Sequence, residues 1–413
     1  MYKRQVLIPT ARRDILIGVN QVIMVCFSMA VISAFIGAKG LGFNLLLALN
    51  QLNIGLALEA GLCISLIAIL LDKMSLAWAN QQQDYFGNLS FYQRNKNVIF
   101  FAASFVIGII LAYVGTFIFK GSFNYLFEIP HNKGISTADF WNKGVDWIFD
   151  TFFVYIKAFN TWLIQDVLQP MRALYLRMPA VATLVLAVGA GYLIGGVRSA
   201  LVVAALTLFI ALSPWWDRAL VTLYMATFGV VISCLIGFTV GTLCFQNKKS
   251  AAFMLGVCDI FQTFPSFVYL IPVMMLFGIT DTSVLIAVIV YATIPATRYT
   301  IEGLRSVPVG LHEAATMSGV NKFQRLTKIE FPLAFPHMML GLNQTIVFAL
   351  FMVIIGAFIG TEDLGQYILK ALSDKNGAGI GLTLGICVAF IGLIFDNLIR
   401  TWVGKRKKHL GID

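Results

Sequence analysis

The sequence predicts an all-α protein that crosses a membrane many times, because it is apolar, poor in charge and built from long apolar runs. Of its 413 residues, 59% are hydrophobic and only 12% are charged. A soluble domain carries about twice that charged fraction. Several of the apolar runs reach the roughly 20 residues that a helix needs to cross the hydrocarbon core. We therefore expect a polytopic membrane protein.

Taken in order along the chain, the apolar runs predict about ten transmembrane helices. They lie at 15–37, 55–77, 97–119, 179–196, 199–213, 219–245, 260–280, 283–298, 337–359 and 379–402. Basic residues then collect on one side of the membrane, as at Arg12, Lys73, Lys248 and the KRKK run at 405–408. The positive-inside rule puts that side, and the C-terminus with it, in the cytoplasm. Orientation thus explains the net charge of +10, and we expect no nucleic-acid partner.

Cysteines and histidines show no pattern typical of a metal site or a disulfide framework. The six cysteines lie in apolar runs or at their edges without a CxxC pair, and the four histidines are scattered. The chain has no G-x-x-x-x-G-K-[ST] phosphate-binding loop. We therefore expect no cofactor and no enzymatic activity, with any ATP hydrolysed on a partner polypeptide.

The opening of the chain resembles its end, which predicts an internal duplication with an offset of 323 residues. The paired positions are Pro9 and Pro332, Asn20-Gln21 and Asn343-Gln344, Gly37 and Gly360 and, after a one-residue shift, Gly61 and Gly385, Asp72 and Asp396, and Trp78 and Trp402. Low-complexity apolar sequence does not readily give ordered matches of these residue types. The first copy lacks its front part, so either the chain is the back of a tandem protein or another polypeptide supplies that part.

The duplication and the composition divide the chain into six regions. They are the end of a first copy with two spans (1–78), a polar cytoplasmic linker (79–96), a connecting span (97–119), an external segment (120–178), a complete second copy (179–405) and a cytoplasmic tail (406–413). The external segment has Trp141, Trp147 and Trp162 among apolar and charged residues. We expect it to form amphipathic helices at the outer interface. A small soluble domain is the alternative.

One polar stretch, EAATMSGVNKFQRLTKIEFP at 313–332, is punctuated by glycine and would be costly in lipid. We expect it to lie in water. Its spacing is E-A-A, three residues, Gly, nine residues and I-x-F-P, which resembles the coupling loop of bacterial ABC importer permeases. The resemblance implies two short helices within a loop at 302–332 that dock into a cleft of a cytoplasmic ATPase subunit. An ordinary cytoplasmic loop is the alternative.

The residues of this motif have distinct expected roles. Glu313 is expected near the start of the first helix, where its charge suits the helix dipole. Ala314 and Ala315 offer a small surface to a partner cleft, and Gly319 permits a sharp turn between the helices. Ile329 and Pro332 complete the motif. Pro332 is expected to end the second helix near the bilayer surface.

Further motifs extend the resemblance to the permease of the proline/glycine betaine importer family. They are GVDWIF from Gly144, QTFPSFVYLIPVMMLFGI from Gln262, YATIPATRYTIEGLR from Tyr291 and LGLNQT around Asn343. The likeness covers roughly 140–405 and the duplicated piece 3–78. It implies a type I, MetI-like helical bundle in the bacterial cytoplasmic membrane. It also implies import of glycine betaine, proline betaine or choline, with paired cytoplasmic ATPases, an external substrate-binding protein and a second permease half.

Polar and aromatic residues inside the spans are candidates for the translocation path. They are the amides Asn20, Gln21, Asn343 and Gln344 and the aromatic residues Phe264 and Tyr269. The amides either line the path or form interhelical hydrogen bonds, worth about 0.6 kcal/mol each in membranes. The aromatic residues either form a gate that holds a methylated ammonium group by cation–π attraction or serve in packing.

Three other functions fit parts of the pattern. An ABC permease for another small solute, such as an amino acid or a sulfonium osmolyte, shares every feature above. An ion-coupled secondary transporter would need ionisable groups deep in the membrane, which the spans do not show. The truncated first copy is also compatible with a remnant that transports nothing.

Overall fold

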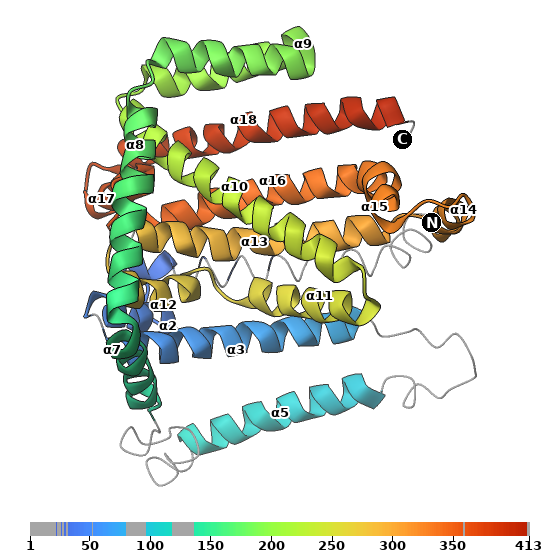
Figure 1. Cartoon of the computed structure of the whole chain (residues 1–413). Coiled ribbons are helices and arrows are strands. Elements are labelled where there is room, and N and C mark those ends of the chain that lie inside the picture. Colours follow the sequence, from blue (N-terminus) through green and yellow to red (C-terminus); the bar gives the residue numbers. More distant parts are fainter. Residues whose placement is uncertain are drawn as a thin grey trace, which may run out of the picture.

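All regular secondary structure that the structure describes is helical (Figure 1). The computed structural model describes residues 32–51, 53–79, 96–117, 136–357 and 360–410, with the single positions 22, 26 and 29. Most of the long helices run along one common direction, and α7 (Ala138–Trp162) crosses their ends. The all-α class expected from the composition is therefore confirmed.

Three helices of the expected second copy (179–405) form the centre of the bundle. They are α10 (Trp216–Phe245), α13 (Asp281–Arg305) and α16 (Phe331–Gly356), and α13 packs along both of the others. Around them lie α9 (Ala180–Leu212), α11 (Lys248–Thr263), α12 (Phe267–Phe277), α17 (Leu364–Ser373) and α18 (Ala378–Leu410).

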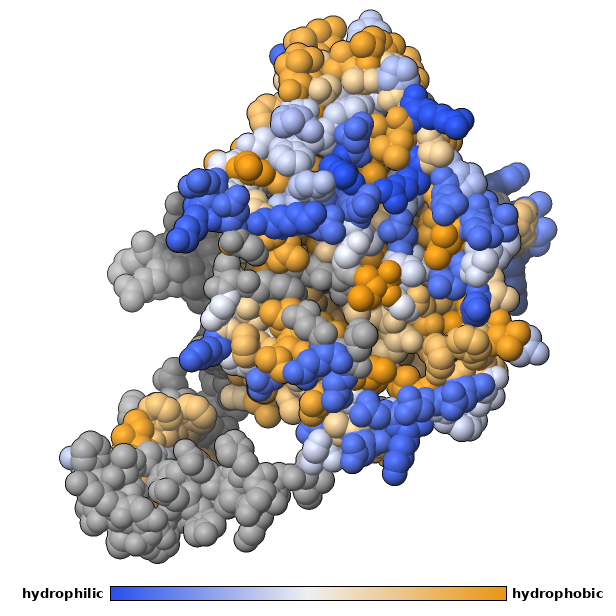
Figure 2. Space-filling model, turned by 90° about the vertical axis from the view of Figure 1, so that its left-hand side faces the viewer, coloured by the Kyte–Doolittle hydropathy of each residue, from blue (hydrophilic) through white to orange (hydrophobic). Residues whose placement is uncertain are grey.

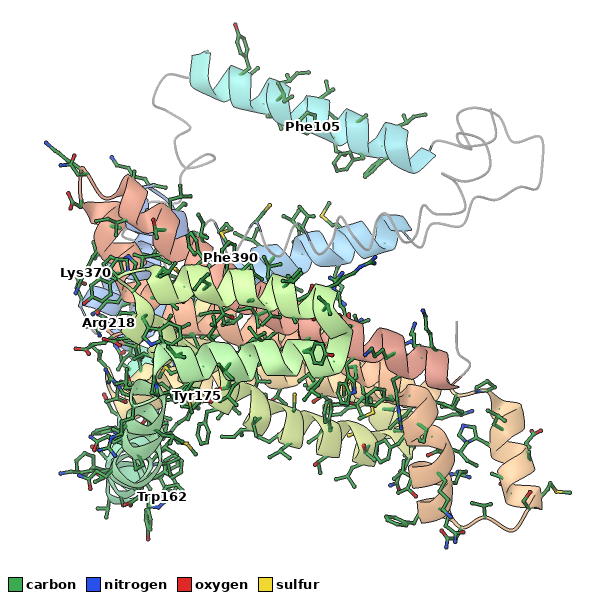
Figure 3. The ribbon with its side chains drawn as sticks, turned by 90° about the horizontal axis from the view of Figure 1, so that it is seen from above. Phe105, Trp162, Tyr175, Arg218, Lys370 and Phe390 are labelled. Atoms are coloured by element: carbon green, nitrogen blue, oxygen red, sulfur yellow. The ribbon has the colours of Figure 1, made fainter. Side chains whose placement is uncertain are left out.

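Six helices among the described residues are long and apolar enough to cross a membrane, and α11 with α12 adds a seventh if that bent pair is one span. The expected span at 97–119 corresponds to α5 (Lys96–Phe117), which includes the apolar stretch Ile99–Leu111. The described side chains at 100–111 are exposed, and Phe105 is 63% exposed (Figure 3). The expected span at 15–37 falls largely outside the described residues.

The expected spans at 179–196 and 199–213 are the two halves of α9. Gly196 has a φ of +71° and interrupts the helix between them. The chain folds back there, which brings Gly191 close to the second half of α9. A Cβ on Gly191 would lie 3.2 Å from the Cα of Ala200. Glycine at 191 thus allows the two halves to pack closely, as the hairpin in Figure 1 shows.

The span expected at 260–280 is instead a broken helix that begins much earlier. The first segment, α11, starts at Lys248, and the second segment, α12, ends at Phe277, with a bend of 90° between them. Proline disfavours the helical conformation of the residue before it. Phe264, which precedes Pro265, is extended with a ψ of 133°. Pro265 therefore explains the break.

A long helix lies across the ends of the spans. α7 continues through a π-helical stretch (Leu163–Leu168) into α8 (Gln169–Leu176), and Pro170 in the first turn of α8 follows the π-helical stretch. α7 meets α3 (Ile54–Ala79), where the Asn142 side chain accepts a hydrogen bond from the Gly55 amide at 2.7 Å. Its position at an outer membrane interface stays a prediction.

The duplicated segments have matching local structure. α2 (Leu41–Asn50) and α17 are each 10 residues long and begin 323 positions apart, whereas α3 and α18 begin 324 positions apart. Gly37 and Gly360, which precede the two short helices, both have positive φ, at +90° and +112°. The connection after α17 is one residue longer than the one after α2. That extra residue accounts for the one-residue shift between the sequence matches.

Glycine brings the central helices into backbone contact. A Cβ on Gly237 of α10 would lie 2.5 Å from the Cβ of Ala296 on α13, and one on Gly341 of α16 would lie 2.7 Å from the Cβ of Tyr299. Lipid tails are as apolar as leucine, so membrane helices associate mainly through close packing of small residues. These contacts therefore determine how α10, α13 and α16 are spaced.

We expect Gly237→Ala to destabilise the contact between α10 and α13, because the added methyl group has no room. The expected loss is about 1–3 kcal/mol, seen as a lower midpoint of thermal unfolding in detergent. Gly385→Ala on α18 is the matched control, since no atom lies within 4 Å of the added carbon. Equal unfolding midpoints for the two variants would contradict this account of the core.

Candidate functional site

The motif at 313–332 projects from the end of the bundle opposite to α7 (Figure 1). It consists of α14 (Val309–Met317), a turn, α15 (Lys322–Arg325) and a π-helical stretch (Leu326–Glu330) that leads directly into α16. At the turn, the Val320 amide donates to the Ala315 carbonyl at 3.1 Å. Gly319 has a φ of +72°, a conformation that glycine adopts without strain.

Two residues of the motif lie elsewhere than expected. Glu313 is in the middle of α14, because Pro308 starts this helix five residues earlier. Its side chain is exposed. Pro332 does not end a helix, since it occupies the first turn of α16 in a helix that continues from Lys322 to Gly356. Its missing amide falls directly after the π-helical stretch, where the regular α-helical hydrogen-bond pattern is already interrupted.

The remaining residues of the motif differ in exposure. Ala314 is exposed, Ala315 is buried and Ile329 is half-buried. The largest exposed apolar side chains near the turn are Met317, at 89% exposed, and Phe323, at 73%. These two exposed apolar side chains, on either side of the turn, are candidates for contact with a partner protein.

A buried acidic side chain fastens α14 to the start of α16. Glu330 is only 2% exposed, and its Oε1 lies 3.1 Å from Nδ1 of His312 and 2.9 Å from Nε of Arg325. A buried carboxylate needs such partners, because leaving it unpaired would be strongly destabilising. Sequence analysis missed this contact. The acidic residue within I-E-F-P, between two apolar positions, was the available signal.

Of the candidate path amides, Asn343 forms an interhelical contact. It is 8% exposed, and its Nδ2 donates to Oδ1 of Asp396 on α18 at 2.8 Å. Arg400 donates to the same oxygen from its Nε at 2.7 Å. Gln344 is half-buried, and the pair at 20–21 lies outside the described residues. A role of these amides in the path stays a prediction.

The candidate aromatic residues lie at the break between α11 and α12, and the ring of each is 6.1 Å from the ring of Phe261. Phe264 is half-buried in the break, and Tyr269 on α12 is 7% exposed. The Tyr269 ring lies 5.3 Å from the ring of Tyr291 on α13, which stacks at 4.7 Å on Phe348 of α16. The Tyr269 hydroxyl donates to the backbone carbonyl of Phe261 across the break. Three helices thus contribute to one aromatic cluster.

Charged side chains form a second cluster at the end of the bundle near α7. Glu362 accepts hydrogen bonds from Arg172 of α8 at 3.0 Å and from Arg218 of α10 at 3.2 Å. Arg172 also lies 3.7 Å from Asp281, which accepts a hydrogen bond from Tyr224 at 3.0 Å. The two arginines hold the pKa of the Glu362 carboxyl below its usual range. This outer cluster links α8, α10 and α13 to the α16–α17 connection.

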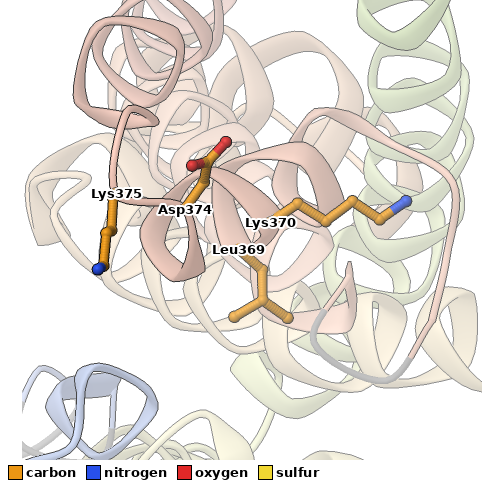
Figure 4. Close-up of a pocket in the computed structure, with 4 residues that line it drawn as sticks. All are labelled: Leu369, Lys370, Asp374 and Lys375. Atoms are coloured by element: carbon orange, nitrogen blue, oxygen red, sulfur yellow. The ribbon is translucent and has the colours of Figure 1, made fainter.

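Further charged and aromatic side chains surround this outer cluster. Arg218 and Lys370 lie at the same end of the bundle (Figure 3). Both stack on the ring of Tyr367, at 4.9 and 4.8 Å from its centroid. Lys370 also lines an open surface depression with Leu369, Asp374 and Lys375 (Figure 4). The sequence singled out none of these as site residues, and only Arg218 is far from its partner Tyr367 in the chain.

Comparison with known proteins identifies the family. Residues 229–409 match the binding-protein-dependent transport system inner membrane component. Over 283 residues, the chain is 30% identical to the glycine betaine/proline betaine transport system permease protein ProW of Escherichia coli, covering 68% of this chain and 79% of ProW. The chain belongs to this family of transport permeases. The expected multi-pass, MetI-like permease fold is thereby confirmed.

Two other relatives of this permease match almost its whole length. It is 88% identical over 408 residues to the trimethylamine N-oxide transport system permease protein TmoV of Pelagibacter ubique, and 40% identical over 425 residues to TmoV of Ruegeria pomeroyi. Each alignment covers 99% of this chain. The chain spans only 57% and 61% of the length of these two relatives.

The residue directly after Glu362 of the outer cluster, Asp363, carries a carboxyl group that is costly to ionise. Asp363 has no exposed surface, and its Oδ1 accepts a hydrogen bond from the Gln366 amide at 3.1 Å as the N-cap of α17. Its Oδ2 is buried without a hydrogen-bond partner among the described residues. Burial raises the pKa of Asp363 to about 8. The protonated form is therefore favoured in the folded protein at neutral pH.

We expect the permease to lose stability as the pH rises from 5.5 to 8.5, because the folded state then holds a proton that the unfolded state has released. The loss is at most about 1.4 kcal/mol per pH unit, and it ends above the folded pKa. Asp363→Asn keeps a capping oxygen but cannot ionise, so its unfolding midpoint should depend less on pH. Asp374→Asn, at an exposed carboxylate, is the control and should leave the wild-type slope unchanged. An unchanged slope in Asp363→Asn would contradict the prediction.

Proposed function

We propose that this chain is part of the permease of an ABC importer for small methylated amines, with trimethylamine N-oxide as its main solute. The identity of 88% over 99% of the chain to a permease named for that solute carries the proposal. Glycine betaine is the second candidate, because related permeases at about 30% identity are named for it. The chain forms part of the path that the solute takes through the membrane, and a partner subunit hydrolyses the ATP.

This proposal refines the betaine-type substrate expected from the sequence. Trimethylamine N-oxide and glycine betaine share a trimethylated, positively charged nitrogen and a negatively charged oxygen. The aromatic cluster at the α11–α12 break suits such a nitrogen, since ring faces attract methylated ammonium groups. Choline, proline, amino acids and sulfonium osmolytes remain alternatives that a competition experiment can separate.

The motif at 313–332 is proposed as the coupling site for the cytoplasmic ATPase. Met317 and Phe323 offer an exposed apolar surface on either side of the turn at Gly319. Glu330 joins α14 to the base of α16 through His312. Because α16 packs along α13, a displacement of α14 by the closing ATPases would move the central helices together. This movement would open the translocation path to one side of the membrane and then to the other.

The end of the molecule that carries α7 is proposed to face outward and to receive the substrate-binding protein. Figure 2 shows that hydrophilic and hydrophobic residues both reach this surface. The outer cluster and the depression beside Lys370 supply charges of both signs. The second permease half would come from another part of a longer chain or from another subunit. In this arrangement, the C-terminus lies in the cytoplasm of a bacterial cell.

We expect proteoliposomes that contain the assembled transporter, with its ATPase and binding protein, to accumulate radiolabelled trimethylamine N-oxide only when ATP is supplied inside. Excess unlabelled glycine betaine should compete less strongly than unlabelled trimethylamine N-oxide, and proline should not compete. Uptake that stops when ion gradients are dissipated, with ATP still present, would instead indicate a secondary transporter. Competition by proline alone would overturn the proposed substrate class.

We expect Gly319→Val to abolish ATP-coupled uptake while leaving membrane insertion intact. A β-branched residue at a φ of +72° is strained, so the turn would rearrange and misplace α14. The expected loss of uptake is more than about tenfold, because misplacement of a docking surface affects every turnover. Gly256→Val on α11 is the control, since no atom lies within 4 Å of the added Cβ. Normal uptake and ATPase stimulation in Gly319→Val would refute the coupling role.

A further inference from the structure

The break between α11 and α12 lies in the middle of the bundle. α11 begins at Lys248, directly after α10, and α12 ends at Phe277, whose carbonyl accepts a hydrogen bond at 3.2 Å from Asn160 of α7. The break at 264–266 therefore lies between the two surfaces of the membrane. Non-helical backbone at this depth is tolerated only where protein buries it or where it lines a cavity. Broken helices of this kind form substrate sites in other classes of transporter.

A polar side chain at this break lacks a partner. Ser266 is the N-cap residue of α12 and has no exposed surface. Its hydroxyl makes no hydrogen bond with any part of the chain that the structure describes. A buried hydroxyl without a partner costs free energy, and the N-terminus of a helix favours a negative charge. Both features would suit a negatively charged oxygen.

Aromatic rings lie on the same side of the break. Tyr269 is three residues after Ser266, which places both on one face of the first turn of α12. The Tyr269 ring is followed by the Tyr291 ring at 5.3 Å, and the Tyr291 ring stacks on Phe348 at 4.7 Å. The three rings come from three helices, and Tyr291 contacts each of the other two. Because close packing holds α13 against α16, a ligand can reach the rings only if α12 moves away from α13.

α12 is placed to allow such a separation. It packs between α13 of the second copy and α3 of the first copy. Gly61 of α3 gives it room there, because a Cβ at this position would lie 3.3 Å from side-chain carbons of Val268 and Ile271. α12 thus lies where the two copies meet. If α12 moved with α3 while α13 stayed packed against α10 and α16, the gap between Tyr269 and Tyr291 would open.

We propose that this break is a substrate site within the membrane, closed in this structure, for a trimethylated zwitterion. The methylated nitrogen lies between the rings of Tyr269 and Tyr291, and Phe348 supports the Tyr291 ring by stacking on it. The negatively charged oxygen accepts a hydrogen bond from the Ser266 hydroxyl at the N-terminus of α12. The site rests on the proposed function, which it deepens by naming the groups that hold the solute between release from the binding protein and entry into the cell.

The test compares variants of the assembled transporter in proteoliposomes, at saturating binding protein loaded with trimethylamine N-oxide. Tyr291→Leu should lower the maximal rate of uptake about tenfold, because it removes a ring face from the methylated nitrogen. Tyr291→Phe keeps the ring and should stay within about twofold of wild type. ATP hydrolysis stimulated by the binding protein should continue in both variants, so Tyr291→Leu should consume more ATP per molecule transported.

Two further variants separate a binding role from packing. Phe390→Leu removes one ring of another interhelical pair, Phe209 and Phe390, whose centroids lie 5.0 Å apart on α9 and α18. This control should keep wild-type uptake and ATP consumption. Ser266→Ala loses only the hydroxyl and should lower uptake severalfold without lowering the unfolding midpoint, since no hydrogen bond to the described chain is lost.

The uptake rates of these variants support or contradict the proposed membrane site. If Tyr291→Leu and Phe390→Leu reduce uptake equally, or if Ser266→Ala and Tyr291→Leu both retain wild-type rates, the proposed membrane site is wrong while the transporter still carries methylated amines. If the wild-type transporter carries no methylated amine, the proposed function itself fails. Loss of uptake in Tyr291→Leu with rescue in Tyr291→Phe and normal rates in Phe390→Leu would support the site.

Discussion

The close approach of α10, α13 and α16 is the constraint on which the rest of the structure depends. In lipid, burial of apolar side chains gives little net drive for two helices to associate, so contact between backbones has to hold them. Gly237 and Gly341 allow this contact on the two sides of α13. Because α13 and α16 also carry Tyr291 and Phe348, the same packing fixes the aromatic cluster. It also connects the motif at 313–332 to the middle of the bundle.

The two polar clusters use different electrostatics at the two ends of this bundle. At the end that carries α14, Glu330 is almost fully buried. Loss of its partners His312 and Arg325 would leave this buried carboxyl group unpaired and destabilise the fold. At the other end, Glu362 is largely exposed and is shared by Arg172 and Arg218. Exposed ion pairs contribute little to stability and are weakened by salt. The first cluster therefore suits a permanent joint, and the second suits a contact that opens and closes.

Local sequence was enough to predict what depends on local chemistry. Apolar runs gave most helices, and the glycine at 319 indicated the turn that its positive φ now shows. The start of α14 was misjudged because Pro308, not Glu313, sets it. Long-range contacts could not be predicted, since Arg172 and Glu362 are 190 residues apart and only the fold brings them together. The break at Pro265 was readable in principle, but the apolar run across it favoured one continuous span.

The long helix of α7 and α8, which crosses the ends of the spans, is attached to helices from both ends of the chain. Asn142 ties it to α3 of the first copy, and Tyr175 bonds to Thr227 on α10 of the second copy at 2.8 Å. Asn160, which lies between these two points, donates a hydrogen bond to the Phe277 carbonyl of α12 at 3.2 Å. The long helix is therefore attached to the C-terminal half of the chain before the π-helical stretch at Leu163–Leu168 begins. If α3 and α12 were to move apart at this end, α7 would have to bend or slide between Asn142 and Asn160.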